Sequence, residues 1–165
     1  MTVLIIGYPD SGKSKIAEDM VMDMSAPGER VYLATMIPYG DEGRARIEKH
    51  RKMREGKGFR TIEAPFDAAA AAEESGVSGS ATVLLECLSN LVANEMFERH
   101  TDSEAVIEKV TADVMRLADN VRDLVIVSNH FEPEESFDEE TVIYAGTLDM
   151  LNEKISGLAD KTIRI

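Results

Sequence analysis

The residues near the N-terminus combine glycines, a lysine and a serine at a spacing that can bind phosphate groups. Residues 7–14 are GYPDSGKS, which fits the phosphate-loop pattern G-x-x-x-x-G-K-[ST]. Gly7 and Gly12 permit backbone angles at which successive N–H groups point at phosphate oxygens. Lys13 would add positive charge at the β- and γ-phosphates, and the Ser14 hydroxyl would ligate Mg²⁺. The predicted nucleotide contacts of this loop are Gly7, Tyr8, Pro9, Asp10, Ser11, Gly12, Lys13 and Ser14.

The flanking sequence places this loop between a strand and a helix. Val3 to Ile6 is a short aliphatic run, typical of a buried strand, and a helix from about Lys13 to Ser25 follows. The helix would aim its positive end at the bound anion. A glycine-rich turn that matches by chance is the alternative, and the strand and helix make it the weaker interpretation. The helix positions that we expect on its buried face are Ile16, Ala17, Met20, Val21 and Met24.

The rest of the chain alternates strands and helices, which predicts an α/β fold with a mostly parallel sheet flanked by helices, similar to phosphate-loop NTPases. We expect one nucleotide-binding domain over residues 1–165. Further strands are expected at 31–34, 59–63, 81–86, 124–128 and 161–165. Further helices are expected at 41–55, 66–72, 87–100, 103–120 and 141–159, with an acidic loop at 131–140.

The composition restricts the classes of partner. The chain has 165 residues, with 31 acidic residues against 18 basic ones and a formal net charge of −13. A protein this acidic is poorly suited to nucleic acid or anionic membranes, so a phosphate ligand needs a local positive site. The single cysteine excludes an internal disulfide and fits a reducing cytoplasm. We expect neither a membrane span nor a signal peptide, because the apolar runs are too short.

One segment, residues 41–55, could supply that local charge. It is predicted to be a helix and is the one strongly basic stretch in the chain. Charge runs of this kind are usually solvated faces with Glu–Arg pairing. The alternative is a binding role, because the segment follows the end of a strand at which α/β sheets place ligands. Its basic side chains and histidine are Arg44, Arg46, Lys49, His50, Arg51, Lys52 and Arg54.

Three further side chains could do chemistry. Glu86 follows four apolar strand residues, the position where phosphate-loop enzymes carry an acid that holds Mg²⁺ or its water. A strand-end acid facing water is the alternative for Glu86. Cys87 lacks an activating pattern and is interpreted as a small core residue. His130 follows a buried strand and could be catalytic, although a lone histidine is more often structural.

Several stretches together resemble one family, the bifunctional adenosylcobinamide kinase/adenosylcobinamide-phosphate guanylyltransferases of cobalamin biosynthesis. The element Arg46-Ile47-x-x-His50-Arg51, spaced after YLAT at 32–35, makes the match specific, because the phosphate loop alone is generic. The resemblance covers nearly the whole chain in order. The other matching segments are Ile5 to Gly7, Ser11 to Ser14, Thr61-x-Glu63, Leu84 to Leu91, Asn94 and Val125-x-Val127-Ser128-Asn129, with a weaker match at Gly146 and Asn152.

The resemblance implies two reactions. In the first, ATP or GTP phosphorylates the hydroxyl of the aminopropanol arm of adenosylcobinamide. In the second, GTP transfers GMP to an enzyme histidine, releasing pyrophosphate, and then to the cobinamide phosphate. By its place in the motif, His50 is the implied guanylylated residue. His50 and Lys13 are therefore the expected catalytic residues.

The same resemblance implies further contacts and partners. Ser14 and Glu86 are the expected metal ligands, with Mg²⁺ as the metal. The implied acceptor is a corrinoid, and the implied assembly is a homo-oligomer, a trimer with nucleotide near the subunit contacts. The nucleotide contacts that it implies outside the phosphate loop are Thr35, Met36, Ile37, Arg51, Lys52, Met53, Arg54, Glu63 and Glu86.

Two regions depart from the family pattern. After Asn129 the chain has His-Phe-Glu-Pro-Glu-Glu in place of a glycine-rich, proline-containing segment, and the helix start at Thr141 lacks an arginine. Tyr8 to Asp10 stand where a basic residue is common. Two alternatives therefore stay open. One is a phosphate-loop kinase of another small molecule, and the other is a nucleotide-binding regulatory protein that has lost the corrinoid site.

Overall fold

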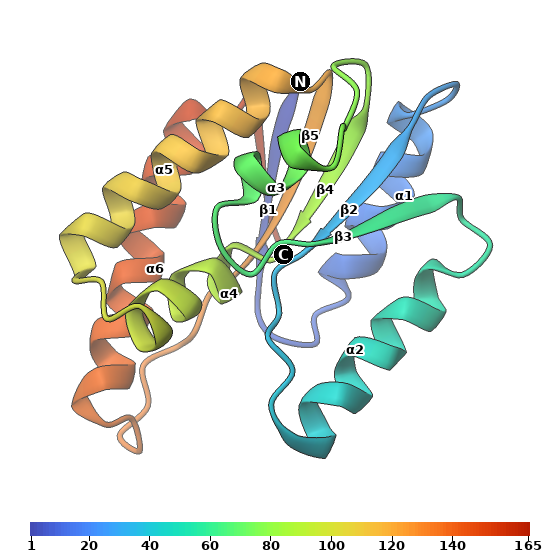
Figure 1. Cartoon of the computed structure of the whole chain (residues 1–165). Coiled ribbons are helices and arrows are strands. Elements are labelled where there is room, and N and C mark those ends of the chain that lie inside the picture. The colour runs from blue at the N-terminus through green and yellow to red at the C-terminus, as the bar shows by residue number, and fades with distance from the viewer.

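A six-stranded sheet forms the centre of the protein, whose computed structural model describes residues 1–165 (Figure 1). The strand order is β3-β2-β4-β5-β1-β6, and every neighbouring pair is parallel. Parallel pairing brings the carboxyl ends of all strands to one edge, where the phosphate loop follows β1. The strands are β1 (Thr2–Gly7), β2 (Arg30–Ala34), β3 (Phe59–Glu63), β4 (Thr82–Glu86), β5 (Asp123–Asn129) and β6 (Lys161–Arg164).

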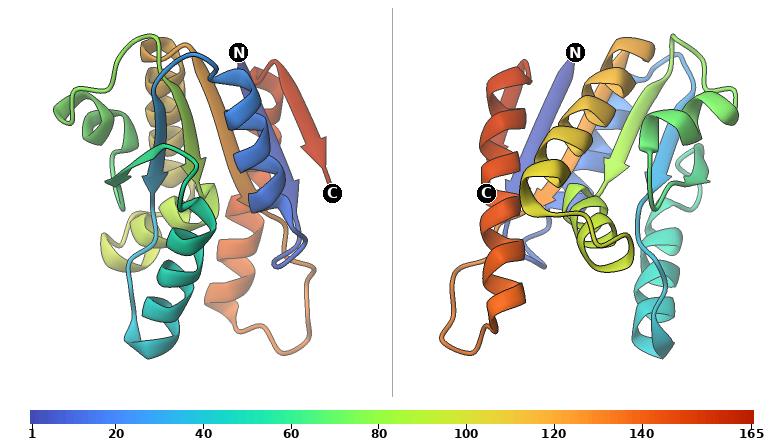
Figure 2. Two further views of the ribbon diagram at one scale, coloured as in Figure 1. Left: turned by 90° about the vertical axis from the view of Figure 1, so that its right-hand side faces the viewer. Right: turned by 60° about the vertical axis from the view of Figure 1, so that its left-hand side comes forward.

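Helices cover both faces of this sheet, as the alternation of side chains along each strand requires (Figure 2). Val3, Ile5 and Val125 pack against α1 on one face. Leu4 and Ile126 belong to the larger core on the other face, under α3 to α6. The helices are α1 (Lys13–Met24), α2 (Gly40–Arg54), α3 (Ala68–Glu74), α4 (Leu88–Ala93), a π-helical turn η1 (Asn94–Glu98), α5 (Ser103–Asn120) and α6 (Glu139–Leu158).

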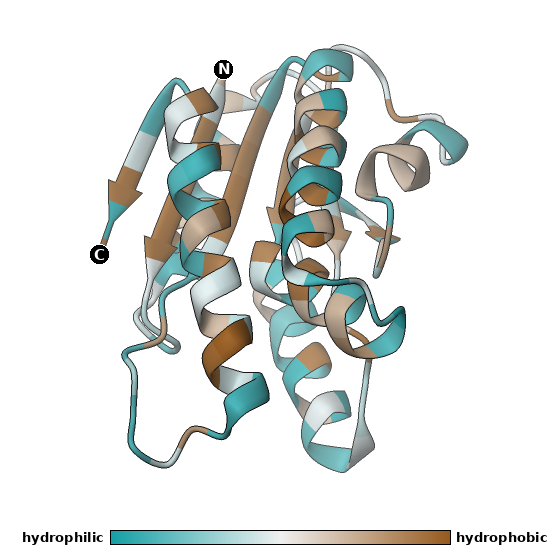
Figure 3. Cartoon of the chain, turned by 90° about the vertical axis from the view of Figure 1, so that its left-hand side faces the viewer, coloured by the Kyte–Doolittle hydropathy of each residue, from teal (hydrophilic) through white to brown (hydrophobic).

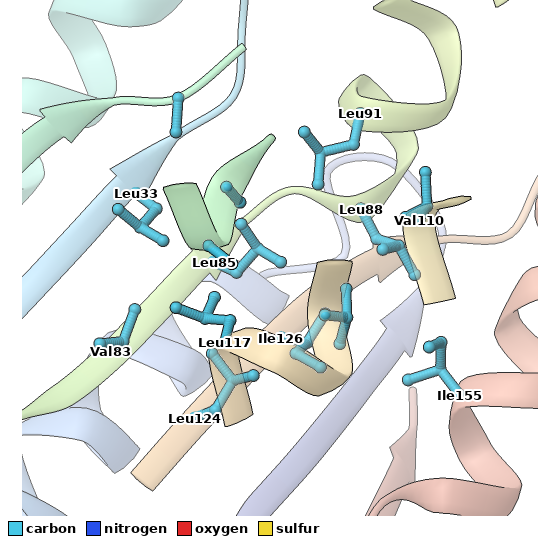
Figure 4. Close-up of a cluster of buried hydrophobic side chains, with 14 of the residues drawn as sticks. Leu33, Val83, Leu85, Leu88, Leu91, Val110, Leu117, Leu124, Ile126 and Ile155 are labelled. Atoms are coloured by element: carbon cyan, nitrogen blue, oxygen red, sulfur yellow. The ribbon is translucent and has the colours of Figure 1, made fainter. Parts of the chain in front are cut away.

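The larger core joins the strands to the helices by close aliphatic packing. Figure 4 shows Leu85 and Ile126 from adjacent strands beside Leu88 of α4 and Leu117 of α5. In Figure 3 the strands are largely hydrophobic, whereas the helices in front carry polar residues on their outer faces. No helix combines the length and the apolar character that a bilayer-spanning segment needs.

The expected order of strands and helices is confirmed, and three details were wrong. Ile16 is 41% exposed, because α1 buries a narrower face than its apolar spacing suggested. The helix expected from residue 66 begins at Ala68, since Asp67 adopts a positive φ of 49° and the Asp113 carboxylate accepts the first N–H groups. The helix expected over 87–100 is α-helical only to Ala93 and continues as the π turn η1.

The basic helix α2 extends from the carboxyl-terminal edge of the sheet and packs little against the rest of the molecule (Figures 1 and 2). Only Gly43 and Arg54 are buried among its 15 residues. The turn after α2 is fastened to α1 instead. There Lys57 Nζ lies 2.7 Å from the fully buried Glu18 carboxylate, and the Lys57 carbonyl accepts from Arg30 at 2.6 Å. This ion pair therefore helps to set where α2 leaves the fold.

Replacing Lys57 by Met should leave the Glu18 carboxylate buried without a partner. We expect the free energy of unfolding to fall by about 2–3 kcal/mol, because an uncompensated buried charge is costly. Urea unfolding of the purified variant measures this loss. The double variant Lys57→Met/Glu18→Met removes the charge as well and should regain most of the stability. Equal losses in the single and double variants would contradict this account of the pair.

Candidate functional site

A cavity of about 490 Å³ lies at the carboxyl ends of the strands, between the phosphate loop and α2. Its walls come from segments that are far apart in sequence: the loop after β1, the face of β2, the basic helix, and the ends of β4 and β5. The predicted site residues that line this cavity are Pro9, Asp10, Ser11, Gly12, Lys13, Ser14, Met36, His50, Arg51, Met53, Arg54, Glu63 and Glu86.

The phosphate loop has the backbone geometry that anion binding requires. Gly12 has a φ of +84° directly before α1 begins, a conformation that favours glycine. A Cβ on Gly7 would lie 2.7 Å from the Ser11 hydroxyl oxygen, so a larger residue there would displace the Ser11 side chain. That hydroxyl oxygen is buried and has no hydrogen-bond partner. An unpaired donor in this cradle is suited to a phosphate oxygen.

Lys13 points back into the loop. Its Nζ donates to the carbonyl of Tyr8 at 2.8 Å, and the side chain is almost fully buried. Burial lowers the pKa of Lys13, and the nearby Arg46 charge lowers it further, while Cys87 and Glu86 oppose these effects. A phosphate group would provide the negative partner that this ammonium lacks.

The carboxylate of Glu86 lies opposite the loop. Ser14 donates its hydroxyl to Glu86 Oε1, and Tyr32 donates to Oε2 at 3.2 Å. Hydroxyl and carboxylate oxygens are the ligands that Mg²⁺ prefers, and Mg²⁺ usually takes only one or two protein ligands beside phosphates and water. No group of three or more metal-binding side chains is present. The Ser14–Glu86 pair therefore fits an ion that completes its shell with nucleotide oxygens.

His50 reaches the same carboxylate from α2. Its Nδ1 lies 3.9 Å from Glu86 Oε1 and is buried without a hydrogen-bond partner. Arg46, Lys49 and Arg51 of the same helix also line the cavity. One face of the basic helix thus turns toward the phosphate loop, while Arg44 pairs with Asp41 on the outer surface. This arrangement supplies the local positive charge that an acidic protein needs in order to hold a nucleotide.

Five predicted contacts do not line the cavity. They are Gly7, Tyr8, Thr35, Ile37 and Lys52. Thr35 is fully buried, and its hydroxyl accepts from the Cys87 amide at 2.6 Å and donates to the Cys87 carbonyl at 2.9 Å. Lys52 lines a separate, more open groove beside β3. Contact between these residues and a nucleotide stays a prediction.

Other residues line the cavity without having been expected there. Tyr32 lies on β2, and its ring is covered by the Arg54 guanidinium, 3.6 Å from the ring centroid. Asn129 stands at the carboxyl end of β5, a position from which it could have been found. No sequence signal indicates Tyr144, because it reaches the cavity from α6 only through tertiary packing.

Cys87 and His130 have local partners. Cys87 is partly buried, its Sγ lies 2.8 Å from the Ser89 hydroxyl, and burial raises the pKa of its thiol, which disfavours the nucleophilic thiolate. His130 Nδ1 lies 2.9 Å from Asp149 and its Nε2 lies 3.5 Å from Glu132. Glu132 also accepts from the Tyr8 hydroxyl at 2.8 Å. His130 thus connects the acidic loop and α6 with the phosphate loop, outside the cavity.

Comparisons with known proteins give two sequence matches. The sequence profile of the family described as cobinamide kinase / cobinamide phosphate guanyltransferase matches residues 3–165. The bifunctional adenosylcobalamin biosynthesis protein CobU of Escherichia coli (strain K12) is 34% identical over 104 residues. That alignment covers 63% of this chain and only 55% of the relative's length.

Solved structures with the same fold include two ATPases. The ATPase domain of G40P has a TM-score of 0.53 at 12% identity, over 91% of this chain and 66% of that one. A prototypical ATPase from the type III secretion system of pathogenic bacteria has a TM-score of 0.61 at 12% identity, over 99% of this chain and 50% of that one. At these identities the likeness concerns the fold alone, and it confirms the predicted phosphate-loop α/β class.

The contacts of His130 predict a pH-dependent term in stability. Hydrogen bonding to Asp149 raises the pKa of His130, and the Asp149 and Glu132 charges add to the rise. The protonated His130 ring therefore contributes fully to the free energy of unfolding below its ordinary pKa of 6.5. This contribution is lost as the pH rises through the higher pKa of the folded state. The free energy of unfolding of the wild type should exceed that of His130→Gln at about pH 5.5, and the difference should shrink as the pH rises to about 8.5. His100→Asn, at an exposed histidine, is the control, and a pH-independent difference for His130→Gln would contradict this assignment.

Proposed function

Because the chain belongs to the cobinamide kinase / cobinamide phosphate guanyltransferase family, we propose that it phosphorylates adenosylcobinamide and transfers GMP from GTP to adenosylcobinamide phosphate. One observation carries this proposal most directly. His50 stands in the same cavity as the phosphate-loop residues Lys13 and Ser14, with Glu86 between the two walls. Transfer through an enzyme-bound nucleotide needs a nucleophilic side chain beside the phosphates, and an imidazole can serve as one.

In the kinase reaction the protein binds and orients the triphosphate. Lys13 and the loop amides hold the β- and γ-phosphates, so that the γ-phosphorus faces the acceptor hydroxyl. Ser14 and Glu86 would hold Mg²⁺, which neutralises negative charge on the phosphates when bound. The acceptor oxygen forms a bond to the γ-phosphorus as the bond to the β-phosphate oxygen breaks, and the hydroxyl proton leaves. ATP and GTP both fit this role.

In the guanylyltransferase reaction His50 is the nucleophile. An unprotonated ring nitrogen attacks the α-phosphorus of GTP, a phosphorus–nitrogen bond forms and pyrophosphate leaves. A phosphate oxygen of the acceptor then attacks the same phosphorus, and the bond to His50 breaks. Arg46, Lys49 and Arg51 line the cavity and would stabilise the negative charge that develops in both steps.

The segment after Asn129 is compatible with two other functions. The segment after Asn129 is acidic, and Glu132 engages the phosphate loop through Tyr8. An acidic segment at this position is compatible with a kinase of another small molecule, or with a regulatory nucleotide-binding protein. The homotrimeric state and the cytoplasmic location also stay predictions.

Incubation with α-³²P-labelled GTP and Mg²⁺ should label the wild-type protein. We expect an acid-labile, base-stable label, since a phosphoramidate at His50 has that chemistry, and we expect none in His50→Ala. His100→Asn is the matched control, because His100 is exposed and its positive φ of 54° is one that Asn tolerates. Autoradiography after denaturing electrophoresis measures the label. A wild type that binds GTP but takes no label would remove the guanylyltransferase half of the proposal.

Substituting Lys13 by Met should weaken nucleotide binding. Loss of a charge-assisted contact with the phosphates should cost about 2 kcal/mol, which is about 30-fold in the dissociation constant. Calorimetric titration with ATP and with GTP measures the change. Lys154→Met removes the same charge from an exposed position on α6 and should bind as the wild type does. Equal weakening in both variants would mean that net charge, and not the loop, controls affinity.

A further inference from the structure

Tyr32 lies in the wall of the cavity, and its hydroxyl has one hydrogen-bond partner, Glu86 Oε2 at 3.2 Å. The two residues come from adjacent strands. Ala34 lies opposite Glu86 in the parallel register of β2 and β4, so Tyr32, two residues earlier, shares the face of the sheet with both. Because Ala34 has only a methyl group, the tyrosine side chain can extend along this face to the carboxylate.

The Tyr32 ring is held from two sides. The Arg54 guanidinium lies 3.6 Å above the ring centroid, and the edge of Phe59 meets the ring at 86° with the centroids 6.2 Å apart. Arg54 Nη2 is also 3.4 Å from the Thr61 hydroxyl. Tyr32, Arg54 and Glu86 are all at least nine-tenths buried. A cation over a ring face withdraws electron density, which makes the phenolic O–H a stronger donor.

The two oxygens of Glu86 therefore have different partners. Oε1 accepts from Ser14 and lies 3.9 Å from His50 Nδ1, while Oε2 is bound by Tyr32. The last torsion of a glutamate is broad, so an unrestrained carboxylate would rotate. The Tyr32 hydroxyl removes that freedom. It keeps Oε1 directed at the metal ligand Ser14 and at the nucleophile.

We propose that Tyr32, braced by Arg54, is a positioning residue that holds the Glu86 carboxylate toward Ser14 and His50. This assignment rests on the proposed function for its consequence in catalysis. Tyr32 has no contact with reacting atoms and acts only through Glu86. Its loss should slow the steps that use Glu86 while leaving GTP recognition by the phosphate loop intact.

The test compares wild type with Tyr32→Phe, Glu86→Gln and the double variant in single-turnover labelling by α-³²P-GTP. We expect Tyr32→Phe to lower the first-order rate constant at saturating GTP by about 10-fold, the scale typical of lost supports behind a metal site. The affinity for GTP measured with chelator, which reports recognition by the phosphate loop without the metal, should stay within about twofold. In the Glu86→Gln background the same substitution should change the rate by less than about twofold, because the two residues act as one unit.

A matched control is Tyr39→Phe, which removes another tyrosine–glutamate hydrogen bond, to Glu98, outside the cavity. It should react as the wild type does, and thermal unfolding checks that all variants fold. A wild-type rate in Tyr32→Phe, or rate losses that multiply in the double variant, would overturn the proposal. A purely structural role for Tyr32 predicts the second result.

A second measurement separates this proposal from the proposed function. Affinity for a non-hydrolysable GTP analogue is measured with Mg²⁺ and with chelator. We expect the gain in affinity from Mg²⁺ to be about 10-fold smaller in Tyr32→Phe than in wild type, and unchanged in Tyr39→Phe. If the wild type takes no label, guanylyl transfer fails as a function, and this ratio alone decides the role of Tyr32. An unchanged ratio would overturn it.

Discussion

Glu86 is nine-tenths buried at the carboxyl end of β4, and a carboxylate in that position needs hydrogen-bond donors. The donors come from two parts of the fold, Ser14 of the phosphate loop and Tyr32 on β2. His50 approaches the same group from α2. The requirement to satisfy one buried charge thus aligns the phosphate loop, the adjacent strand and the basic helix around a single cavity. The all-parallel sheet makes this possible, because it brings the ends of β1, β2 and β4 to one edge.

Positively charged side chains are concentrated at the same cavity. The chain carries a formal charge of −13, yet Arg46, Lys49 and Arg51 face the phosphate loop from α2. This helix buries only two of its residues, so little hydrophobic packing determines its position. The pair between Lys57 and the buried Glu18 fastens its C-terminal turn to α1, the helix that follows the phosphate loop. The Lys57–Glu18 pair thus links the basic helix, which carries His50, to the helix that follows the phosphate loop, and both border the same cavity.

The region after β5 is one of the two that the sequence analysis set apart from the pattern of the family. His130 and Glu132 occupy it, and through Tyr8 they contact the phosphate loop on its outer side. Tyr8 itself stands where the family commonly has a basic residue. The Tyr8 hydroxyl donates to the Glu132 carboxylate at 2.8 Å, which joins the two segments directly. His130, Glu132 and Tyr8 lie outside the cavity that Lys13, Ser14, Glu86 and His50 line.

Much of this was available from the sequence. The phosphate-loop octapeptide and the alternation of short aliphatic runs with helices determine the fold class, because glycine freedom, a lysine and a strand–helix setting are local properties. The Arg46 to Arg51 element, spaced after YLAT, determined the family. The buried strand ending in Glu86 indicated an acid at the ligand edge, where the structure places it. Each of these signals lies within one short stretch of sequence, so residue type and spacing record it.

Only the tertiary structure decided which side chains meet. Tyr32 and Tyr144 reach the cavity from β2 and α6 through packing that no local pattern encodes. The structure also divides the basic helix, because Arg46 and Lys49 line only the cavity whereas Lys52 lines only the other groove. Tertiary packing also leaves Ile16 exposed, and it buries Thr35, whose hydroxyl accepts from the Cys87 amide. Residue type and spacing indicate what a side chain can do, whereas its neighbours are determined by strand register and helix placement, which depend on contacts across the whole chain.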